Sequence, residues 1–390
     1  MKRKVIFIYI LFFLLMTILG SVYTYSIYRR ELEELLNINS IISGIPYIFS
    51  LLFFSIMMSF SGRYLKIENI KKLVFAGGFL LIGAWLISAL IKNIWVFTFS
   101  YGIMMGSAVG ILYGIPLMMV QKSNIIKKGL VSGIMLLGFG LSSVIFSPFA
   151  RWIIDAYSME VLFYIYAILS FVVIFTIILV IDNAYDLKKD NALRENKKVT
   201  KNKSNHKWGS FFFIFSAMTL VGLTMIGLTN VIATKYYNFD AVMISGIIGI
   251  FALLNAISRP IFGYLMDKFS FSKTSITSIA MLFAASMINF FNQGESIVLF
   301  FIAYGIYWFN LGIWLTIMPL YVKNQVGTEN YSKIYGNVFL GYGVSALIGT
   351  LTSSLILESF GSPRNIYVII MIFMIFMFFY LSNKLKKEIK

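Results

Sequence analysis

One arginine inside an apolar stretch is the residue whose chemistry is easiest to infer from this sequence. Arg259 is the single charged residue between positions 241 and 266, and a guanidinium in a membrane helix costs about 2.5 to 3.5 kcal/mol on insertion scales. Its planar fork of N–H donors matches the two oxygens of a carboxylate. Asn255 lies one helical turn earlier on the same face, where its amide can orient the guanidinium or join the site. We therefore expect Arg259 to bind an anion.

A second interpretation of Arg259 involves no ligand. Asp267 lies eight residues later in the sequence, which is about 12 Å along a helix. The long arginine side chain could therefore extend toward the membrane interface at that end of the helix. The sequence leaves both interpretations open.

The other ionisable residues restrict what the chain can do. Every Asp and Glu falls in a predicted loop or at a predicted helix end, so no carboxylate is expected at mid-membrane to bind a cation or to carry a proton. His206 is the only histidine and cysteine is absent, which excludes thiolate catalysis and cysteine-based metal sites. A membrane enzyme would need clustered acids, histidines or a nucleophile with its base. We therefore expect no enzymatic activity, no cofactor and no metal site.

The elements that position Arg259 are predicted to be membrane helices. The chain of 390 residues is 59% hydrophobic, 17% aromatic and only 13% charged, far more apolar than a soluble domain of this size. Apolar runs long enough to cross a bilayer recur along it. The prediction is an all-α membrane protein with twelve transmembrane helices, near residues 5–27, 38–60, 72–91, 94–120, 129–150, 160–181, 210–234, 241–266, 274–292, 296–322, 333–357 and 365–383.

The distribution of positive charge predicts how these helices are oriented. The net charge of +17 could suggest nucleic-acid binding. With the N-terminus in the cytoplasm, however, only six of the 33 Lys and Arg residues fall outside, namely Arg29, Arg30, Lys92, Arg151, Lys235 and Arg364. This asymmetry follows the positive-inside rule. We therefore expect a multi-pass protein of the cytoplasmic membrane, with both termini in the cytoplasm, in contact with the lipid bilayer and without a nucleic-acid partner.

An internal repeat divides the chain into two halves. A shift of 203 residues carries Tyr101-Gly102 onto Tyr304-Gly305, Pro116 onto Pro319, Gly133 onto Gly336 and Gly138-Phe139-Gly140 onto Gly341-Tyr342-Gly343. The polar segment between the halves has the composition of a flexible linker. The predicted domains are a six-helix bundle at 1–181, a cytoplasmic linker at 182–209 and a second six-helix bundle at 210–390. Duplicated bundles are typical of secondary transporters, which bind substrate near the midplane between the halves.

Aromatic and hydroxyl side chains gather in the helices that would face such a site. The first predicted helix contains a hydroxyl-rich stretch that includes Tyr23, the fourth contributes Tyr113 and the tenth contributes Trp308. Any one of these aromatics can equally serve packing or the interfacial belt. Together with Arg259 they could form a pocket in which phenol hydroxyls and the guanidinium share the oxygens of a carboxylate.

Four segments of the sequence resemble a known family. They are GSVYTYSIY in the first helix, YGIMMGSAVGILYGIP running into KKGLVSGIMLLGFG, NAISRPIFGYLMDK around Arg259, and YGNVFLGYGVSALIG in the eleventh helix. Through them the chain resembles the major facilitator superfamily over nearly its whole length and, within it, the oxalate/formate antiporter family, which is related to the monocarboxylate transporters. The resemblance implies the major facilitator fold, with two pseudo-symmetric six-helix bundles. It also implies that Arg259 contacts a carboxylate substrate and that Tyr23, Tyr113 and Trp308 line the site.

Two positions depart from that family and narrow the expected substrate. Oxalate transporters of the family carry a lysine in the eleventh helix where this sequence has Tyr342, so a dianion would lack its second cation. Proton-coupled monocarboxylate transporters tend to carry an aspartate where this sequence has Asn255. The resemblance therefore implies a monocarboxylate such as formate, lactate or pyruvate in preference to oxalate, with Tyr342 and Asn255 as further site residues.

The second half keeps the superfamily's aspartate in the loop after its second helix, at Asp267, whereas the first half lacks it. We expect Asp267, Lys268 and Gly263 to serve conformational gating. The expected function is that of a monomeric secondary transporter that exchanges small organic anions by alternating access. The alternatives are a major facilitator exporter of a drug or other solute and, from different classes, a non-transporting membrane sensor or a polytopic membrane enzyme.

Overall fold

The computed structural model describes residues 2–90, 93–185, 208–292, 294–360 and 363–389, and every regular element in these ranges is a helix. Eleven helical segments within them are long and apolar enough to cross a membrane. This agrees with the predicted all-α membrane class, because a helix satisfies its own backbone hydrogen bonds inside a bilayer.

The first half of the chain supplies six of these segments. Its elements are α1 (Lys2–Leu19), η1 (Gly20–Thr24), α2 (Tyr25–Leu36), α3 (Ser40–Tyr64), η2 (Ile67–Asn69), α4 (Ile70–Ala89), α5 (Ile94–Phe97), η3 (Thr98–Met105), α6 (Gly106–Lys122), α7 (Lys128–Ala156) and α8 (Met159–Tyr185). The 3₁₀ segment η1 and the π-helical segment η3 interrupt the first and fourth spans, where the sequence predicts continuous helices. Irregular turns of this kind often occur at functional sites.

The second half supplies the other five segments. Its elements are α10 (Gly209–Tyr237), α11 (Ala241–Lys268), α12 (Phe271–Asn292), α13 (Ile297–Phe360) and α14 (Pro363–Ile389). The predicted linker at 182–209 lies mostly outside the described residues; the parts that are described are the end of α8, the turn residue Trp208 and the first residue of α10.

Two predicted helices, at 296–322 and 333–357, are joined into α13. The joint contains one non-helical residue, Gly327, at φ 74° and ψ 173°, a conformation that glycine adopts readily because it lacks a Cβ. Contacts with α10 before the joint are Trp308 with Thr229 and Tyr321 with Phe211, and after it Gly341 with Ser216 and Gly349 with Thr224. The chain therefore reverses its direction at the joint, and two antiparallel parts of α13 flank α10.

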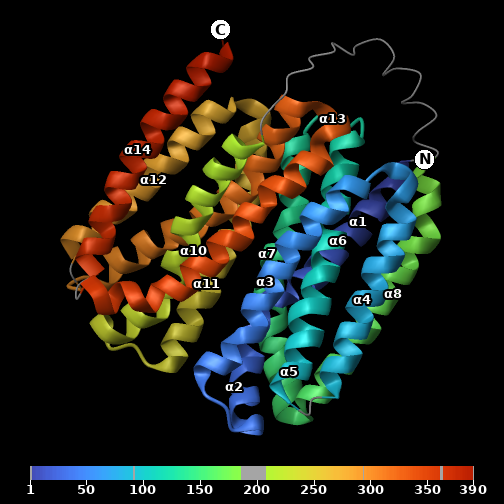
Figure 1. Cartoon of the computed structure of the whole chain (residues 1–390), viewed down its shortest axis with the longest axis horizontal. Coiled ribbons are helices and arrows are strands. Elements are labelled where there is room, and N and C mark those ends of the chain that lie inside the picture. Colours follow the sequence, from blue (N-terminus) through green and yellow to red (C-terminus); the bar gives the residue numbers. More distant parts are fainter. Residues whose placement is uncertain (1, 91–92, 186–207, 293, 361–362, 390) are drawn as a thin grey trace.

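The helices form two groups that lie side by side (Figure 1). Helices α1 to α8 pack with one another, and helices α10 to α14 pack with one another. Both ends of the described chain, the start of α1 and the end of α14, lie at the same end of the molecule (Figure 1). We call this end the terminal face and the other end the opposite face.

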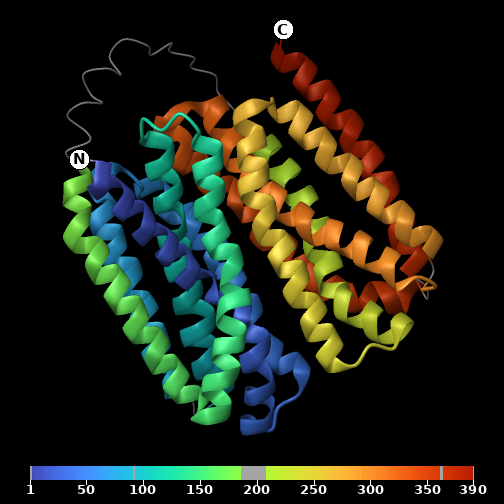
Figure 2. The same ribbon diagram turned by 180° about the vertical axis from the view of Figure 1, so that it is seen from behind.

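The two groups meet where α7 packs on α11 and where α3 packs on α13. Glycines make this contact close: a Cβ on Gly62 of α3 would overlap the carbonyl oxygen of Ser332, and one on Gly263 of α11 would overlap that of Gly129. Backbones approach this closely only where side chains are small. These contacts lie toward the terminal face, and the ribbons of α7 and α11 diverge toward the opposite face (Figure 2).

Candidate functional site

Arg259 of α11 is buried, with 1% of its surface exposed. Its Nη1 donates to the backbone carbonyl of Leu136 on α7 at 2.6 Å, and its Nη2 donates to Asn255 Oδ1 at 2.9 Å. The side chain therefore crosses the boundary between the two halves. It does not extend toward Asp267, as the interpretation without a ligand would require.

The backbone of α7 leaves room for this guanidinium. A Cβ on Gly140 would lie 3.1 Å from Arg259 Cζ and 2.9 Å from Ala256 Cα, and a Cβ on Gly133 would overlap the Arg259 carbonyl oxygen. A spacing of seven residues is close to two helical turns, so both glycines lie on one face of α7. They let α11 approach closely enough for the Leu136 carbonyl to accept a hydrogen bond from Arg259.

The charge of Arg259 has no opposite charge beside it. Arg29, Arg30 and Arg151 form ion pairs near the opposite face, and no carboxylate of the described residues pairs with Arg259. Its Nε also has no hydrogen-bond partner. A buried cation without a counter-charge is costly, and an unpaired buried N–H adds to that cost. This arrangement suits one anionic group.

Phe139 connects Arg259 to two of the predicted site tyrosines. Its ring centroid lies 5.9 Å from Arg259 Cζ, within the range of a cation–π contact. Tyr23 and Tyr113 meet the same ring edge-on, with centroids 5.2 and 5.1 Å away. The cation is thus backed by an aromatic wall that carries hydroxyl groups.

Tyr23 reaches this wall through the irregular segment η1. Gly20 begins η1 and packs on α7, where a Cβ would overlap the Phe139 carbonyl oxygen. Tyr23 is half-buried, and its hydroxyl lies 2.6 Å from the hydroxyl of Tyr342 on α13. Tyr342 is itself 1% exposed. These two predicted site residues therefore form a hydrogen bond that joins the two halves.

Both polar atoms of the Asn255 side-chain amide form hydrogen bonds. Its Oδ1 accepts from Arg259, and its Nδ2 donates to the backbone carbonyl of Trp308 at 2.8 Å. The indole of Trp308 donates instead to the hydroxyl of Thr229 on α10 at 3.0 Å. The structure thus brings the backbone of Trp308 next to the Arg259–Asn255 pair, while its side chain is held by the neighbouring helix.

Asp267 and Gly263 lie where α11 meets α7 near the terminal face. The carboxylate oxygens of Asp267 accept from the backbone N–H groups of Gly129 and Leu130 at 2.7 and 2.8 Å. A side chain of the second half therefore caps the first turn of a helix of the first half. Lys268 is exposed, and its ammonium lies 5.6 Å from the centre of the Phe269 ring.

The sequence prediction missed several groups at Arg259 or on the helices that surround it. Leu136 contributes only its carbonyl, which nothing in the sequence marks. Phe139 lies between Gly138 and Gly140, and this pattern could have identified it as a packing partner. Tyr331 and Tyr335 stack with centroids 5.6 Å apart, and their buried hydroxyls have no hydrogen-bond partner; their spacing of four residues on one helix face was the available signal.

Comparisons with known proteins give the family. The family model described as "Major Facilitator Superfamily" matches residues 5–336. An Escherichia coli (strain K12) protein described as "Uncharacterized MFS-type transporter YhjX" is 27% identical over 335 residues, which cover 84% of this chain and 82% of that protein.

Two solved structures are similar along almost their whole length. The proton:xylose symporter XylE, bound to 6-bromo-6-deoxy-D-glucose, gives a TM-score of 0.77 at 11% identity and covers 98% of this chain and 96% of its own. The human organic anion transporter MFSD10 (TETRAN) gives a TM-score of 0.73 at 11% identity, and the match covers 97% of this chain and 99% of that one. At this identity the likeness shows the fold alone. Together with the family match and the eleven candidate spans, it shows that the chain belongs to the Major Facilitator Superfamily and is a multi-pass membrane transporter.

Proposed function

We propose that this transporter binds one small monocarboxylate at Arg259 and exchanges it for another across the cytoplasmic membrane by alternating access. The observation that carries the proposal is the buried guanidinium of Arg259, which has no counter-charge among the described residues and an unpartnered Nε. A carboxylate would supply both the missing charge and the missing acceptor. The resemblance to the oxalate/formate antiporter family supports the same class of substrate.

A site that contains a single cation is expected to prefer a substrate with a single carboxylate. Tyr342 stands where oxalate transporters of the family carry a lysine, and its hydroxyl bonds to that of Tyr23 at 2.6 Å. A dianion would therefore retain an uncompensated charge in a buried site. Formate, lactate and pyruvate are the proposed substrates ahead of oxalate. The hydroxyls of Tyr23, Tyr113 and Tyr342, the amide of Asn255 and the ring of Trp308 are the proposed further contacts.

The charge of the empty site favours exchange over uniport. Without substrate, Arg259 would have to pass through each conformational change as a buried cation with no counter-charge, which is costly. With a carboxylate bound, this cost is removed. The residue one turn before Arg259 is the neutral Asn255, so it supplies no carboxylate that could balance the charge of Arg259 in the empty carrier. A loaded carrier should then change conformation more readily than an empty one, which is the property of an antiporter.

We also propose how the protein sits in the membrane. Counting the two antiparallel parts of α13 separately gives twelve transmembrane helices, six in each of the predicted bundles at 1–181 and 210–390. The positive-inside rule places the terminal face in the cytoplasm. The contact between the halves near that face, through Asp267 and Gly263, then corresponds to a state closed toward the cytoplasm. Asp267, Gly263 and Lys268 are the proposed gating residues.

Counterflow in proteoliposomes tests this function. Purified protein is reconstituted with an unlabelled anion inside, and uptake of labelled formate, lactate, pyruvate and oxalate is measured. We expect monocarboxylates to exchange and Arg259→Gln to lose most of this exchange. Arg30→Gln is the matched control, because Arg30 forms an exposed ion pair with Glu34 and such pairs contribute little.

Two results would contradict the proposal. One is that none of the four carboxylates exchanges, and the other is that Arg259→Gln transports as fast as the parent. Counterflow of an uncharged or cationic solute in their place would favour the alternative of an exporter for another class of solute.

A further inference from the structure

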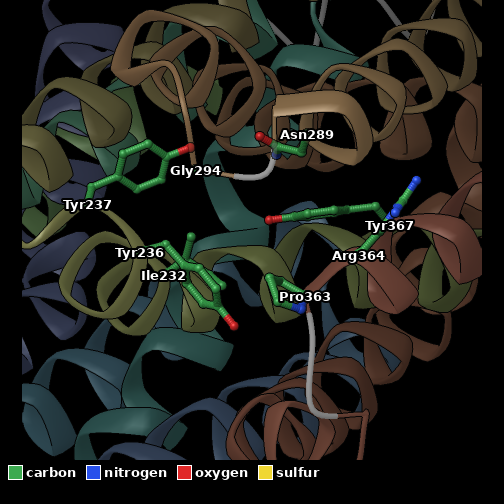
Figure 3. A pocket seen from close by; sticks show the side chains of 8 residues that line it. All are labelled: Ile232, Tyr236, Tyr237, Asn289, Gly294, Pro363, Arg364 and Tyr367. Carbon is green, nitrogen blue, oxygen red and sulfur yellow. The ribbon is translucent and has the colours of Figure 1, made fainter.

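A polar cavity lies away from Arg259, at the opposite face of the second half. It measures about 220 Å³ and is formed where α10 and α12 end and α14 begins (Figure 3). Its lining residues are Ile232, Tyr236, Tyr237, Asn289, Gly294, Pro363, Arg364 and Tyr367. A cavity of this size has room for several water molecules or a small polar group, since a water occupies roughly 30 Å³ in the liquid.

Asn289 is the residue that most directly indicates a bound ligand. It is 4% exposed and lines the cavity, yet its Nδ2 has no hydrogen-bond partner. The hydroxyl of Tyr307 lies near Asn289 but does not meet the geometry of a hydrogen bond with Nδ2, and it is paired instead with the hydroxyl of Ser286 at 2.8 Å. Buried amide donors are normally paired. The unpaired Nδ2 of Asn289 therefore indicates a ligand in the cavity that accepts a hydrogen bond.

The other polar groups around the cavity are also donors. The Tyr237 hydroxyl accepts from Asn292 Nδ2 at 2.7 Å, so its own hydrogen remains available to an acceptor. The Tyr367 hydroxyl lies 3.3 Å from that of Tyr304. Pro363 begins α14, and the start of a helix carries a partial positive charge and N–H groups without helical partners.

A cation lies at the rim of the cavity. The Arg364 side chain lines it, and its guanidinium carbon lies 4.2 Å from the centre of the Phe290 ring, a position held by a cation–π contact. Donors and positive charge therefore surround the cavity, and its preferred occupant is an oxyanion.

The surroundings indicate where that oxyanion comes from. The cavity lies at the ends of three candidate membrane spans, which is the depth of lipid headgroups. Beside it, exposed apolar side chains on α12 and α14 face outward: Met287, Phe291, Ile369 and Ile372. We propose that this cavity binds the phosphate headgroup of a membrane lipid, whose acyl chains lie along α12 and α14. A soluble phosphate ester offers the same chemistry without the chains.

Native mass spectrometry of the full-length protein in detergent tests this proposal. Three probes are added at increasing concentration: dihexanoyl phosphatidylglycerol, dihexanoyl glycerol, which lacks the phosphate, and glycerol 3-phosphate, which lacks the chains. We expect one phosphatidylglycerol to bind per chain. Asn289→Leu and Arg364→Gln should each weaken this binding at least about tenfold, since each removes a group that recognises the phosphate. Arg364 is exposed, so its variant is expected to fold even if the buried Asn289→Leu does not.

Two control variants separate this site from the rest of the protein. Asn230→Leu removes an exposed amide of α10 and should bind as the parent does. Arg259→Gln should also keep the lipid, so the result does not depend on whether the carboxylate site is correct. Displacement of the lipid by glycerol 3-phosphate would identify a site that also accepts soluble phosphate esters, and failure of displacement would identify a lipid site. Equal binding of dihexanoyl glycerol, or unchanged binding in both Asn289→Leu and Arg364→Gln, would overturn the proposal.

Discussion

Asp267 of α11 accepts a hydrogen bond from the backbone N–H of Gly129 at 2.7 Å, and so caps a helix that belongs to the other half of the molecule. A second bond, from Leu130 N–H at 2.8 Å, involves the other carboxylate oxygen. The negative charge also lies at the positive end of the α7 dipole. This cap exists only while the two halves touch at the terminal face, so its free energy favours the closed state at that face.

The first prediction concerns Asp267→Ala. Loss of an N-cap costs about 0.5–2 kcal/mol, so the ratio of closed to open molecules should fall roughly 2- to 30-fold. The chain contains no cysteine, which allows a single reporter, Ser332→Cys, at a buried position beside Gly62. Maleimide labelling of this reporter should become faster. Asp240→Ala removes the cap of α11 at Met243 within one half and should leave the labelling rate unchanged; equal rates in both variants would show that the Asp267 cap does not stabilise closure.

A second prediction uses glycines of α11. In Gly263→Ala the new methyl group would overlap the Gly129 carbonyl oxygen, a backbone atom that cannot move aside. The halves would be forced apart at the terminal face, and we expect exchange to fall about tenfold or more. Gly246 of the same helix has no atom within 4 Å of its Cβ position, so Gly246→Ala gives the same gain in helix propensity without the clash. Its exchange should remain near the parental rate, and similar losses in both variants would rule out the close contact as the cause.

The sequence predicted the features that depend on side-chain type. Arg259 was identifiable because it is a charged residue in an apolar run, where it needs a partner. The spacing of four residues placed Asn255 beside it, and the structure shows a hydrogen bond between the two side chains. The hydroxyl-rich stretch around Tyr23 was also recognisable, because such residues are unusual in a membrane helix.

Other features could not be predicted, because they depend on the backbone. The carbonyl of Leu136 accepts the shorter of the two hydrogen bonds that Arg259 donates. Any residue at that position would offer the same oxygen. The 3₁₀ turn that positions Tyr23 depends on how closely Gly20 approaches α7. Trp308 was selected for its ring, yet its carbonyl meets Asn255.

A third prediction tests the proposed exchange mechanism with Asn255→Asp. The Asn255 oxygen already lies 2.9 Å from Arg259 Nη2, so an ionised carboxylate there would pair with the guanidinium and compete with the substrate anion. Protonation removes the competing charge and restores a donor for the Trp308 carbonyl. Exchange by the variant should therefore be weak at neutral pH and rise as the pH falls. Formate and lactate uptake measured from pH 8 to pH 5, with Asn255→Ser as the uncharged control, checks this. A variant as active as the parent at neutral pH would place the substrate elsewhere.

The last prediction concerns the number of cations in the site. Tyr342 is 1% exposed, and its hydroxyl lies 2.6 Å from that of Tyr23, across the boundary between the halves. Tyr342→Lys would place an ammonium group there, so that a dicarboxylate could be neutralised by one cation from each part of the site. We expect the ratio of oxalate to formate exchange to rise about tenfold, the change produced by roughly 1.4 kcal/mol of selective stabilisation. Tyr342→Phe is the matched control, because it also removes the Tyr23 hydrogen bond but adds no charge. Counterflow with both anions separates the effects: a rise in Tyr342→Lys alone assigns selectivity to the second charge, whereas equal rises in both variants would mean that the lost hydroxyl contact, and not the number of cations, sets the choice of anion.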